Sequence, residues 1–172
     1  GHLEGVQVIP KEEMVIKIKA AIGAKKNSDF FVIARTDSIS VEGLDSAVDR
    51  ISSYVAQGAD MGFVSGIPSA DELKKIPGML DNIPLMVVLT EGGKTPMVPP
   101  NKLGDLGYSL VGYSGLAIGS AGQAVWSNLN ELKRDGYNQN LSSPIMPLDE
   151  RNQILNLEKY QSLESNLLAD SE

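Results

Sequence analysis

Cysteine is absent from the 172-residue chain, and histidine and tryptophan each occur once. The absence of cysteine excludes disulfide bonds, thiolate metal ligands and thiol nucleophiles contributed by these residues. No run approaches the roughly 18 consecutive apolar residues of a membrane-spanning helix, and the printed residues contain no signal-peptide pattern. We therefore expect no membrane partner and a cytoplasmic or organellar location.

Charge of one sign is not concentrated anywhere in the sequence. The formal net charge is −7, from 22 acidic and 15 basic residues, and lysine and arginine form no stripe that could follow a phosphate backbone. We expect no nucleic-acid partner. The content of 42% hydrophobic and 22% charged residues is typical of one globular domain.

Short apolar segments alternate with segments of helical periodicity along most of the chain. The apolar segments predict strands at 30–34, 61–65, 84–89 and 109–113. The first of them, FFVIA, is typical of a strand buried on both faces. The alternation predicts a parallel sheet and therefore an α/β fold. Four strands are too few to close a (β/α)8 barrel, so the pattern fits either a small open sheet or part of a barrel.

Polar, glycine-rich segments follow the predicted strands, in chain order ARTDS, SGIPS, TEGGKTP and YSGLA. The carboxyl ends of parallel strands meet at one edge, where active sites of α/β folds lie. Arg35 directly follows an apolar run and therefore needs an anionic partner. That partner is either a carboxylate of the chain, such as Asp37 or Asp60, or a substrate carboxylate or phosphate bound by the planar guanidinium.

The segment TEGGKTP, at residues 90–96, joins a predicted strand to the next helix. Its two glycines permit a positive φ or a close backbone approach, and it lacks the spacing of a Walker phosphate-binding loop. It is either a tight turn or a catalytic loop that carries Glu91 and Lys94. Trp126 and the leucine and tyrosine stripe near the carboxyl terminus are expected in the core or in a subunit interface.

Several motifs together resemble those of the isocitrate lyase and phosphoenolpyruvate mutase superfamily. They are GHLEG, FVIARTDS, EGLDSAVDR, GADMGFVSG, EGGKTP and LGYSLV, and they follow the order of that family across nearly all of the chain. The segment NLEKYQSLES resembles the last helix of one branch of the family. That branch contains the ethylmalate and dimethylmalate lyases, the oxaloacetate hydrolases and the petal death protein.

The resemblance implies that residues 1–136 form the second half of a (β/α)8 TIM barrel and that residues 137–172 form a helical extension. The extension would be swapped between the subunits of a homodimer or homotetramer. The implied activity is that of a Mg2+-dependent carbon–carbon lyase or hydrolase. It would act on a small organic acid, a 2-hydroxy- or 2-keto-dicarboxylate, through an enolate of an α-keto acid. The metal ligands are expected outside this chain, in an amino-terminal half of the barrel.

Carried over residue by residue, the resemblance implies catalytic roles for His2 on a gating loop and for Arg35 on a substrate carboxylate. The implied substrate-binding residues are Arg35, Ser65, Val88, Thr90, Glu91 and Gly92. The segment from Glu91 to Pro96 matches a loop that closes over the metal end. Gly1 and His2 match the end of a Lys-x-Cys-Gly-His motif, so a catalytic cysteine is expected directly before Gly1. The alternative is that these two residues are a cloning scar.

Two positions depart from the lyase branch. Ser65 stands where that branch usually has glutamate, and Val88 stands where it usually has asparagine. Loss of a donor that stabilises developing charge can lower a rate on the order of 10²-fold. Three interpretations therefore stay open: a lyase or hydrolase for a less polar substrate, a diverged enzyme acting without metal on an apolar biosynthetic intermediate, and a non-catalytic subunit.

Overall fold

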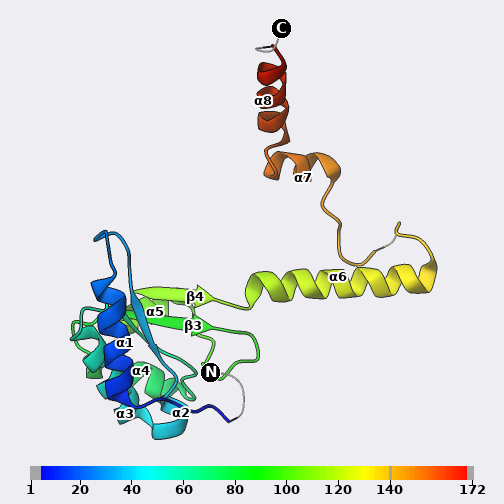
Figure 1. The fold of residues 1–172 in the computed structure, drawn as a ribbon. Coiled ribbons are helices and arrows are strands. Elements are labelled where there is room, and N and C mark those ends of the chain that lie inside the picture. Colours follow the sequence, from blue (N-terminus) through cyan, green and yellow to red (C-terminus); the bar gives the residue numbers. More distant parts are fainter. Residues whose placement is uncertain (1–4, 140, 170–172) are drawn as a thin grey trace. The chain divides into compact units, whose positions relative to one another are not determined.

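The computed structural model describes residues 5–139 and 141–169. In chain order the elements are α1 (Lys11–Gly23), β1 (Ile33–Thr36), α2 (Ile39–Glu42), α3 (Leu44–Val55), β2 (Met61–Val64), α4 (Ala70–Met79), β3 (Leu85–Leu89), α5 (Pro100–Leu106), β4 (Leu110–Tyr113), α6 (Leu116–Asp135), α7 (Leu148–Ile154) and α8 (Leu157–Ala169) (Figure 1). The chain divides between Ile118 and Gly119 into two compact units, each described by itself below. The functional division into 1–136 and 137–172 stays a prediction.

The first unit contains a parallel sheet with the strand order β1-β2-β3-β4. At least one helix lies between successive strands, which confirms the α/β class. The strands predicted at 61–65, 84–89 and 109–113 agree with β2, β3 and β4 to within one residue at each end. The outer strands β1 and β4 each pair on one side only within the described residues, as expected for part of a barrel.

The first strand differs from the prediction at 30–34, because β1 begins only at Ile33. Its partner β2 begins at Met61, which lies opposite Ile33, so the residues before Ile33 have no strand beside them. Phe30 and Phe31 are 62% and 53% exposed. The expectation of burial on both faces is also wrong, since burial in β1 alternates and Ile33 and Arg35 are the exposed positions.

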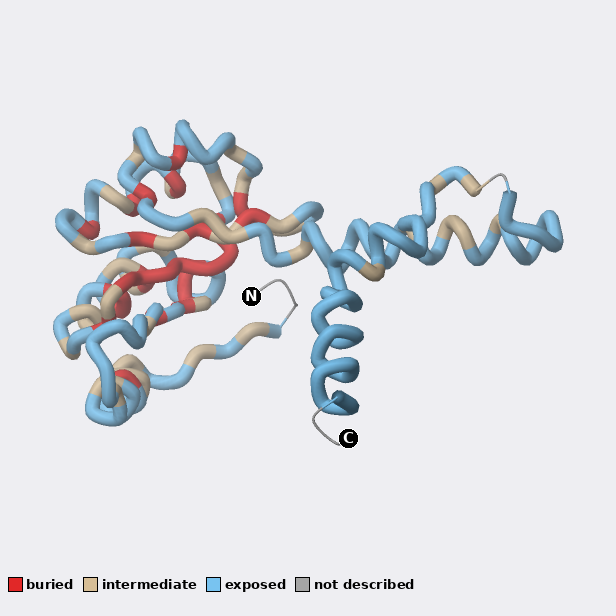
Figure 2. The backbone as a smooth tube through the Cα atoms, turned by 90° about the horizontal axis from the view of Figure 1, so that it is seen from above, coloured by how far each residue is buried: buried red, intermediate tan, exposed pale blue. Residues whose placement is uncertain are grey.

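One face of the sheet is covered by helices α1, α3, α4 and α5, which together with alternate strand residues form the core (Figure 2). The strand residues on this face are Ala34, Val64, Leu85, Val87, Leu89 and Val111. The helices contribute Ile18, Ile51, Tyr54, Leu73, Ile76 and Leu103. Helix α1 begins directly after Pro10 and buries Ile18.

The other strand residues point to the opposite face, here called the inner face, because side chains alternate along a strand. The register places them in lateral rows. One row is Arg35, Phe63, Met86 and Leu110, and Val88 lies beside Gly112 in the next row. Continuing the register by two residues places Asp37 beside Ser65 and Ser65 beside Val88. The two departures from the lyase branch are therefore neighbours on the inner face.

The second unit, from Gly119 onward, contains most of α6 together with α7 and α8. None of these helices has a buried residue. Trp126 is 69% exposed, so its expected place in the core is wrong for the described residues, and a subunit interface stays a prediction. Among the described residues, no helix combines the length and the apolar character needed to cross a membrane.

Candidate active site at the carboxyl ends of the strands

Arg35 lies near the carboxyl end of β1, on the inner face, and forms a two-point ion pair with Asp37. Its Nε donates to Oδ2 of Asp37 at 2.9 Å, and its Nη2 donates to Oδ1 at 2.7 Å. Residues i and i+2 at the end of a strand lie on the same side, so this pairing is local. Of the two carboxylates considered from the sequence, Asp37 is the partner, while Asp60 binds Nζ of Lys25 at 2.9 Å.

The aromatic ring of Phe63 supports the guanidinium of Arg35 from the neighbouring strand. The Cζ atom of Arg35 lies 5.4 Å from the centroid of that ring, within the range of a cation–π contact. The Arg35 side chain is nevertheless 47% exposed. Its Nη1 donates to no other residue that the structure describes. One edge of the guanidinium is thus left for an outside carboxylate or phosphate.

The carboxylate of Asp37 is held in its charged form. Partial burial alone would raise its pKa, but hydrogen bonds from Arg35 and Ser65 and the charge of Arg35 outweigh burial and lower the pKa below its ordinary value. Ser65 is only 5% exposed, and its backbone N–H donates to the carbonyl oxygen of Thr36 at 2.9 Å. A backbone contact at the ends of β1 and β2 therefore anchors the Ser65 main chain next to Asp37.

Apolar side chains occupy the part of the inner face next to Ser65. A Cβ atom on Gly112 would lie 2.9 Å from Cε of Met86 and 3.3 Å from Cγ2 of Val88. These two side chains therefore fill the space above β4 that a larger residue at 112 would need. The position where the lyase branch has an asparagine amide offers only the alkyl surface of Val88.

One row further out, Thr90 and Ser114 join the ends of β3 and β4. Their hydroxyl oxygens lie 2.8 Å apart. The TEGGKTP segment then turns sharply, because the Gly93 N–H donates to the carbonyl oxygen of Thr90 at 2.9 Å and Gly92 has a φ of 72°. Such a turn requires a positive φ at its third residue, which is the position of Gly92. The tight turn is confirmed, and a catalytic role for this loop stays a prediction.

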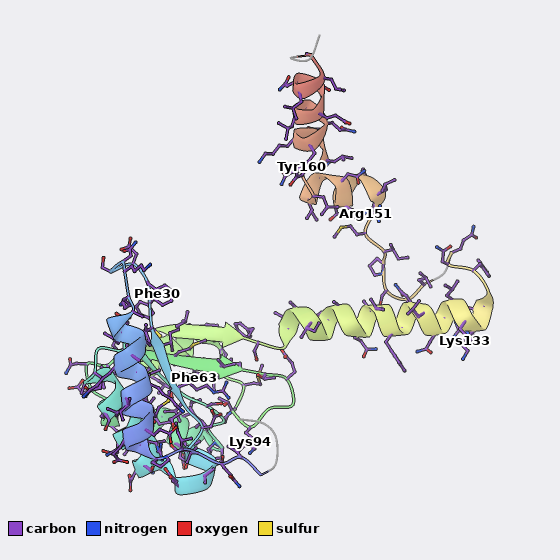
Figure 3. The ribbon with its side chains drawn as sticks, viewed as in Figure 1. Phe30, Phe63, Lys94, Lys133, Arg151 and Tyr160 are labelled. Atoms are coloured by element: carbon purple, nitrogen blue, oxygen red, sulfur yellow. The ribbon has the colours of Figure 1, made fainter. Side chains whose placement is uncertain are left out.

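Within that loop, Glu91 and Lys94 are exposed, and Figure 3 labels the Lys94 side chain. One carboxylate oxygen of Glu91 would lie 3.0 Å from a Cβ atom on Gly115, so the glycine leaves room for the carboxylate beside the start of α6. Thr95 is buried. The loop thus places Thr90, Glu91 and Gly92 at the edge that also holds Arg35.

A second ion pair, which the sequence reasoning missed, fixes the segment that leads to this edge from the amino terminus. Nε and Nη2 of Arg50 donate to the carboxylate of Glu42 at 2.8 and 3.0 Å, and Nη1 donates to the carbonyl oxygen of Ile9 at 3.0 Å. Residues 6–9 line a hollow together with Arg35 and Asp37. Both residues of the pair occur in the EGLDSAVDR motif, which was the available signal.

His2 lies outside the described residues. The described residues contain no group of three or more histidine, aspartate or glutamate side chains arranged to hold a metal ion. The one carboxylate beside Arg35 is already used by the guanidinium. Because Mg2+ requires several oxygen ligands in a near-octahedral arrangement, these residues do not fit a magnesium site by themselves.

Comparison with known proteins agrees with this geometry. Residues 2–133 match the family described as phosphoenolpyruvate phosphomutase. The 2,3-dimethylmalate lyase of Eubacterium barkeri is 34% identical over 166 residues, which are 96% of this chain and 57% of that protein. The trigonal crystal form of 2,3-dimethylmalate lyase, described as a PEP mutase/isocitrate lyase superfamily member, has a TM-score of 0.87 at 28% identity and covers 96% of this chain and 55% of that one.

A more distant structure shares the fold alone. It is a complex of phosphonopyruvate hydrolase with oxalate and Mg2+, with a TM-score of 0.79 at 24% identity over 96% of this chain and 60% of that one. The chain thus spans little more than half the length of the relatives it matches. This coverage and the parallel sheet confirm part of a (β/α)8 barrel rather than a complete small sheet. The chain belongs to the phosphoenolpyruvate mutase/isocitrate lyase superfamily.

Proposed function

We propose that this chain forms the substrate-carboxylate-binding half of a carbon–carbon lyase or hydrolase that acts on a 2-hydroxy- or 2-keto-dicarboxylate. The observation that carries the proposal is the unused edge of the Arg35 guanidinium at the carboxyl end of β1. A planar guanidinium can bind a carboxylate through two parallel hydrogen bonds. The similarity to a 2,3-dimethylmalate lyase supports this class of substrate.

Arg35 would act by stabilising charge. When a carbon–carbon bond next to a keto acid breaks, negative charge develops on the departing fragment, and a fixed positive group lowers that barrier. Phosphonopyruvate hydrolase, which shares the fold, has a structure that contains Mg2+, and we propose that a Mg2+ ion also takes part in the reaction of this protein. Such an ion would add positive charge, with ligands outside the described residues. His2, as a loop histidine, would come from the segment that Arg50 anchors.

The substrate of this chain would be less polar on one side than that of the related lyases. Met86 and Val88 are the partly exposed residues of β3 on the inner face, so together they form one continuous apolar surface, with the buried Ser65 beside Val88. We propose that this surface accommodates an alkyl substituent of the substrate. The same surface also fits the second interpretation, a diverged enzyme that acts on an apolar intermediate without metal.

Turnover assays on the intact gene product test the proposal. We expect release of pyruvate, glyoxylate or oxalate from a panel of alkyl-substituted malates and oxaloacetate, with loss of the signal in EDTA. R35A should lower the rate by about 10²-fold or more. R134A, which removes an exposed arginine paired with Asp135, is the matched control and should leave the rate unchanged. Metal binding without turnover of any panel member would reject the substrate class, and absence of metal binding would reject the lyase.

We further propose that the carboxyl-terminal helices bind a second copy of the chain in a homodimer or homotetramer. In the second unit, α8 carries exposed apolar side chains, among them Leu163 and Leu167. L163E should shift the intact gene product toward monomer in size-exclusion chromatography with light scattering, whereas S165E on the same helix should not. An unchanged mass for L163E would reject this interface.

A further inference from the structure

Asp37 determines which edge of the Arg35 guanidinium is free. We propose that Asp37 is a positioning residue: it binds the Nε/Nη2 edge of Arg35 and, with Ser65 beside it at the end of β2, directs the remaining edge, formed by Nη1 and Nη2, toward a substrate carboxylate. This inference rests on the proposed function of Arg35 as the carboxylate-binding residue. It assigns a task to Asp37, a residue that the proposed chemistry does not use directly.

Contacts with Asp37 and Phe63 restrain the guanidinium along one edge and over one face. Two hydrogen bonds of 2.9 and 2.7 Å to two different oxygens prevent rotation within the plane of the guanidinium. The Phe63 ring, at 5.4 Å, limits movement perpendicular to that plane. A half-exposed arginine without these contacts would sample many rotamers, at a cost when a ligand must order it.

Ser65 is the residue beside Asp37 at the end of the neighbouring strand. It is buried, its backbone N–H donates to the carbonyl oxygen of Thr36, and its side chain helps to lower the pKa of Asp37. A carboxylate at position 65 would place a second negative charge beside Asp37 and disfavour the ionised pair with Arg35. The serine is a neutral neighbour that is compatible with a charged Asp37.

Positioning and simple charge attraction predict opposite outcomes when Asp37 loses its charge. If only the field mattered, removal of a negative group next to the site would strengthen the binding of an anion. If Asp37 positions Arg35, binding weakens although the site becomes more positive. The sign of the change in affinity therefore separates the two explanations.

The test measures oxalate affinity in the presence of Mg2+ by calorimetry on the intact gene product. We expect D37N to bind oxalate about tenfold more weakly than the wild type, the usual loss for a charge-assisted hydrogen bond. D105N, which removes the carboxylate of an exposed pair with Lys102, should bind as the wild type does. If R35A loses oxalate binding but D37N binds oxalate as tightly as the wild type or more tightly, the inference is overturned. Failure of the wild type itself to bind oxalate would instead reject the proposed function, and the inference with it.

A second variant and a second readout guard against misfolding of D37N. S65A leaves the Arg35–Asp37 ion pair in place but removes the hydroxyl beside Asp37. We expect about threefold weaker oxalate binding. The Arg35 Nε–H resonance should be sharp, with slow rotation about the Nε–Cζ bond, in the wild type and in D105N. It should broaden or exchange rapidly in D37N and S65A. An Arg35 signal that is equally mobile in all four proteins would also overturn the inference.

Discussion

Arg50, on α3, donates a hydrogen bond of 3.0 Å to the backbone carbonyl oxygen of Ile9, 41 residues earlier in the chain. The same guanidinium binds the Glu42 carboxylate with two further hydrogen bonds, and its side chain is only 7% exposed. Residues 6–9 lie beside Arg35 and Asp37. One buried arginine thus holds the segment that connects the candidate loop histidine to the rest of the first unit.

Replacement of Arg50 by alanine should release this segment. R50A leaves the Ile9 carbonyl without its side-chain donor and Glu42 with only the Ser46 hydroxyl, so we expect a loss of about 2 kcal/mol in the free energy of unfolding. Deuterium uptake should rise in a peptide that contains Val6–Ile9. R134A provides the exposed arginine control and should change neither quantity. Unchanged protection of the segment in R50A would show that other contacts hold it.

The carboxylate of Asp60, which binds the backbone just before β1, should make the free energy of unfolding depend on pH. It accepts hydrogen bonds from the Val32 N–H at 2.8 Å and from Lys25 at 2.9 Å, and these lower the pKa of Asp60. A group with a lowered folded-state pKa stabilises the protein above its unfolded-state pKa of about 3.9 and loses this contribution as the pH falls through the folded-state value. The difference in unfolding free energy between wild type and D60N should therefore be largest near neutral pH and shrink below about pH 4. A difference that stays constant down to pH 2 would contradict this assignment.

Gly62 should resist substitution because β2 and α3 are in contact at this point. A Cβ atom there would run into the side chain of Ile51 and would lie 3.2 Å from Cδ2 of Leu85. We expect G62A to cost about 1–3 kcal/mol in thermal or denaturant unfolding, as overpacked cores do. Gly104, in α5, has open space where its Cβ would be, so G104A should be neutral or stabilising. Equal effects of the two variants would mean that packing does not limit position 62.

The sequence predicted elements well where a strand and its neighbour have matching limits, as in β2, β3 and β4. It failed for β1 because the apolar run begins at Phe30, before Ile33, which is the first residue with a partner on β2. Residues without a neighbouring strand do not form ladder hydrogen bonds. Val32 lies just before β1, and its backbone N–H donates to the Asp60 carboxylate rather than to the backbone of a neighbouring strand. No property of the run itself marks that boundary.

The candidate site was predictable to the extent that its contacts are local. Arg35 and Asp37 are two residues apart, so the strand geometry alone brings them together, and the turn at Gly92 follows from local glycine chemistry. The contact of Arg50 with Ile9 could not be predicted, because it depends on how α1 and α3 pack. The adjacency of Ser65 and Val88 likewise required the register of β2 and β3.

Val88 offers a direct test of the apolar surface. V88N would restore the amide that the lyase branch usually carries, and we expect it to raise kcat/KM for unsubstituted malate relative to an alkyl-substituted malate by about tenfold or more. V87A, on the core face of the same strand, is the control for general damage to β3 and should lower stability without this change in preference. An unchanged preference in V88N would place the substituent elsewhere.

The pairing of Arg35 with Asp37 also has a consequence for association in solution. The pair carries no net charge, and the whole chain has a formal charge of −7, so the long-range field of this half repels a dicarboxylate rather than steering it inward. Recognition must then arise at contact distance. Raising the ionic strength shortens the range of that repulsion to about 3 Å at 1 M salt. We therefore expect added salt to leave the association rate of an anionic substrate unchanged or to raise it. A site built on an unpaired arginine would instead show a lower association rate in salt.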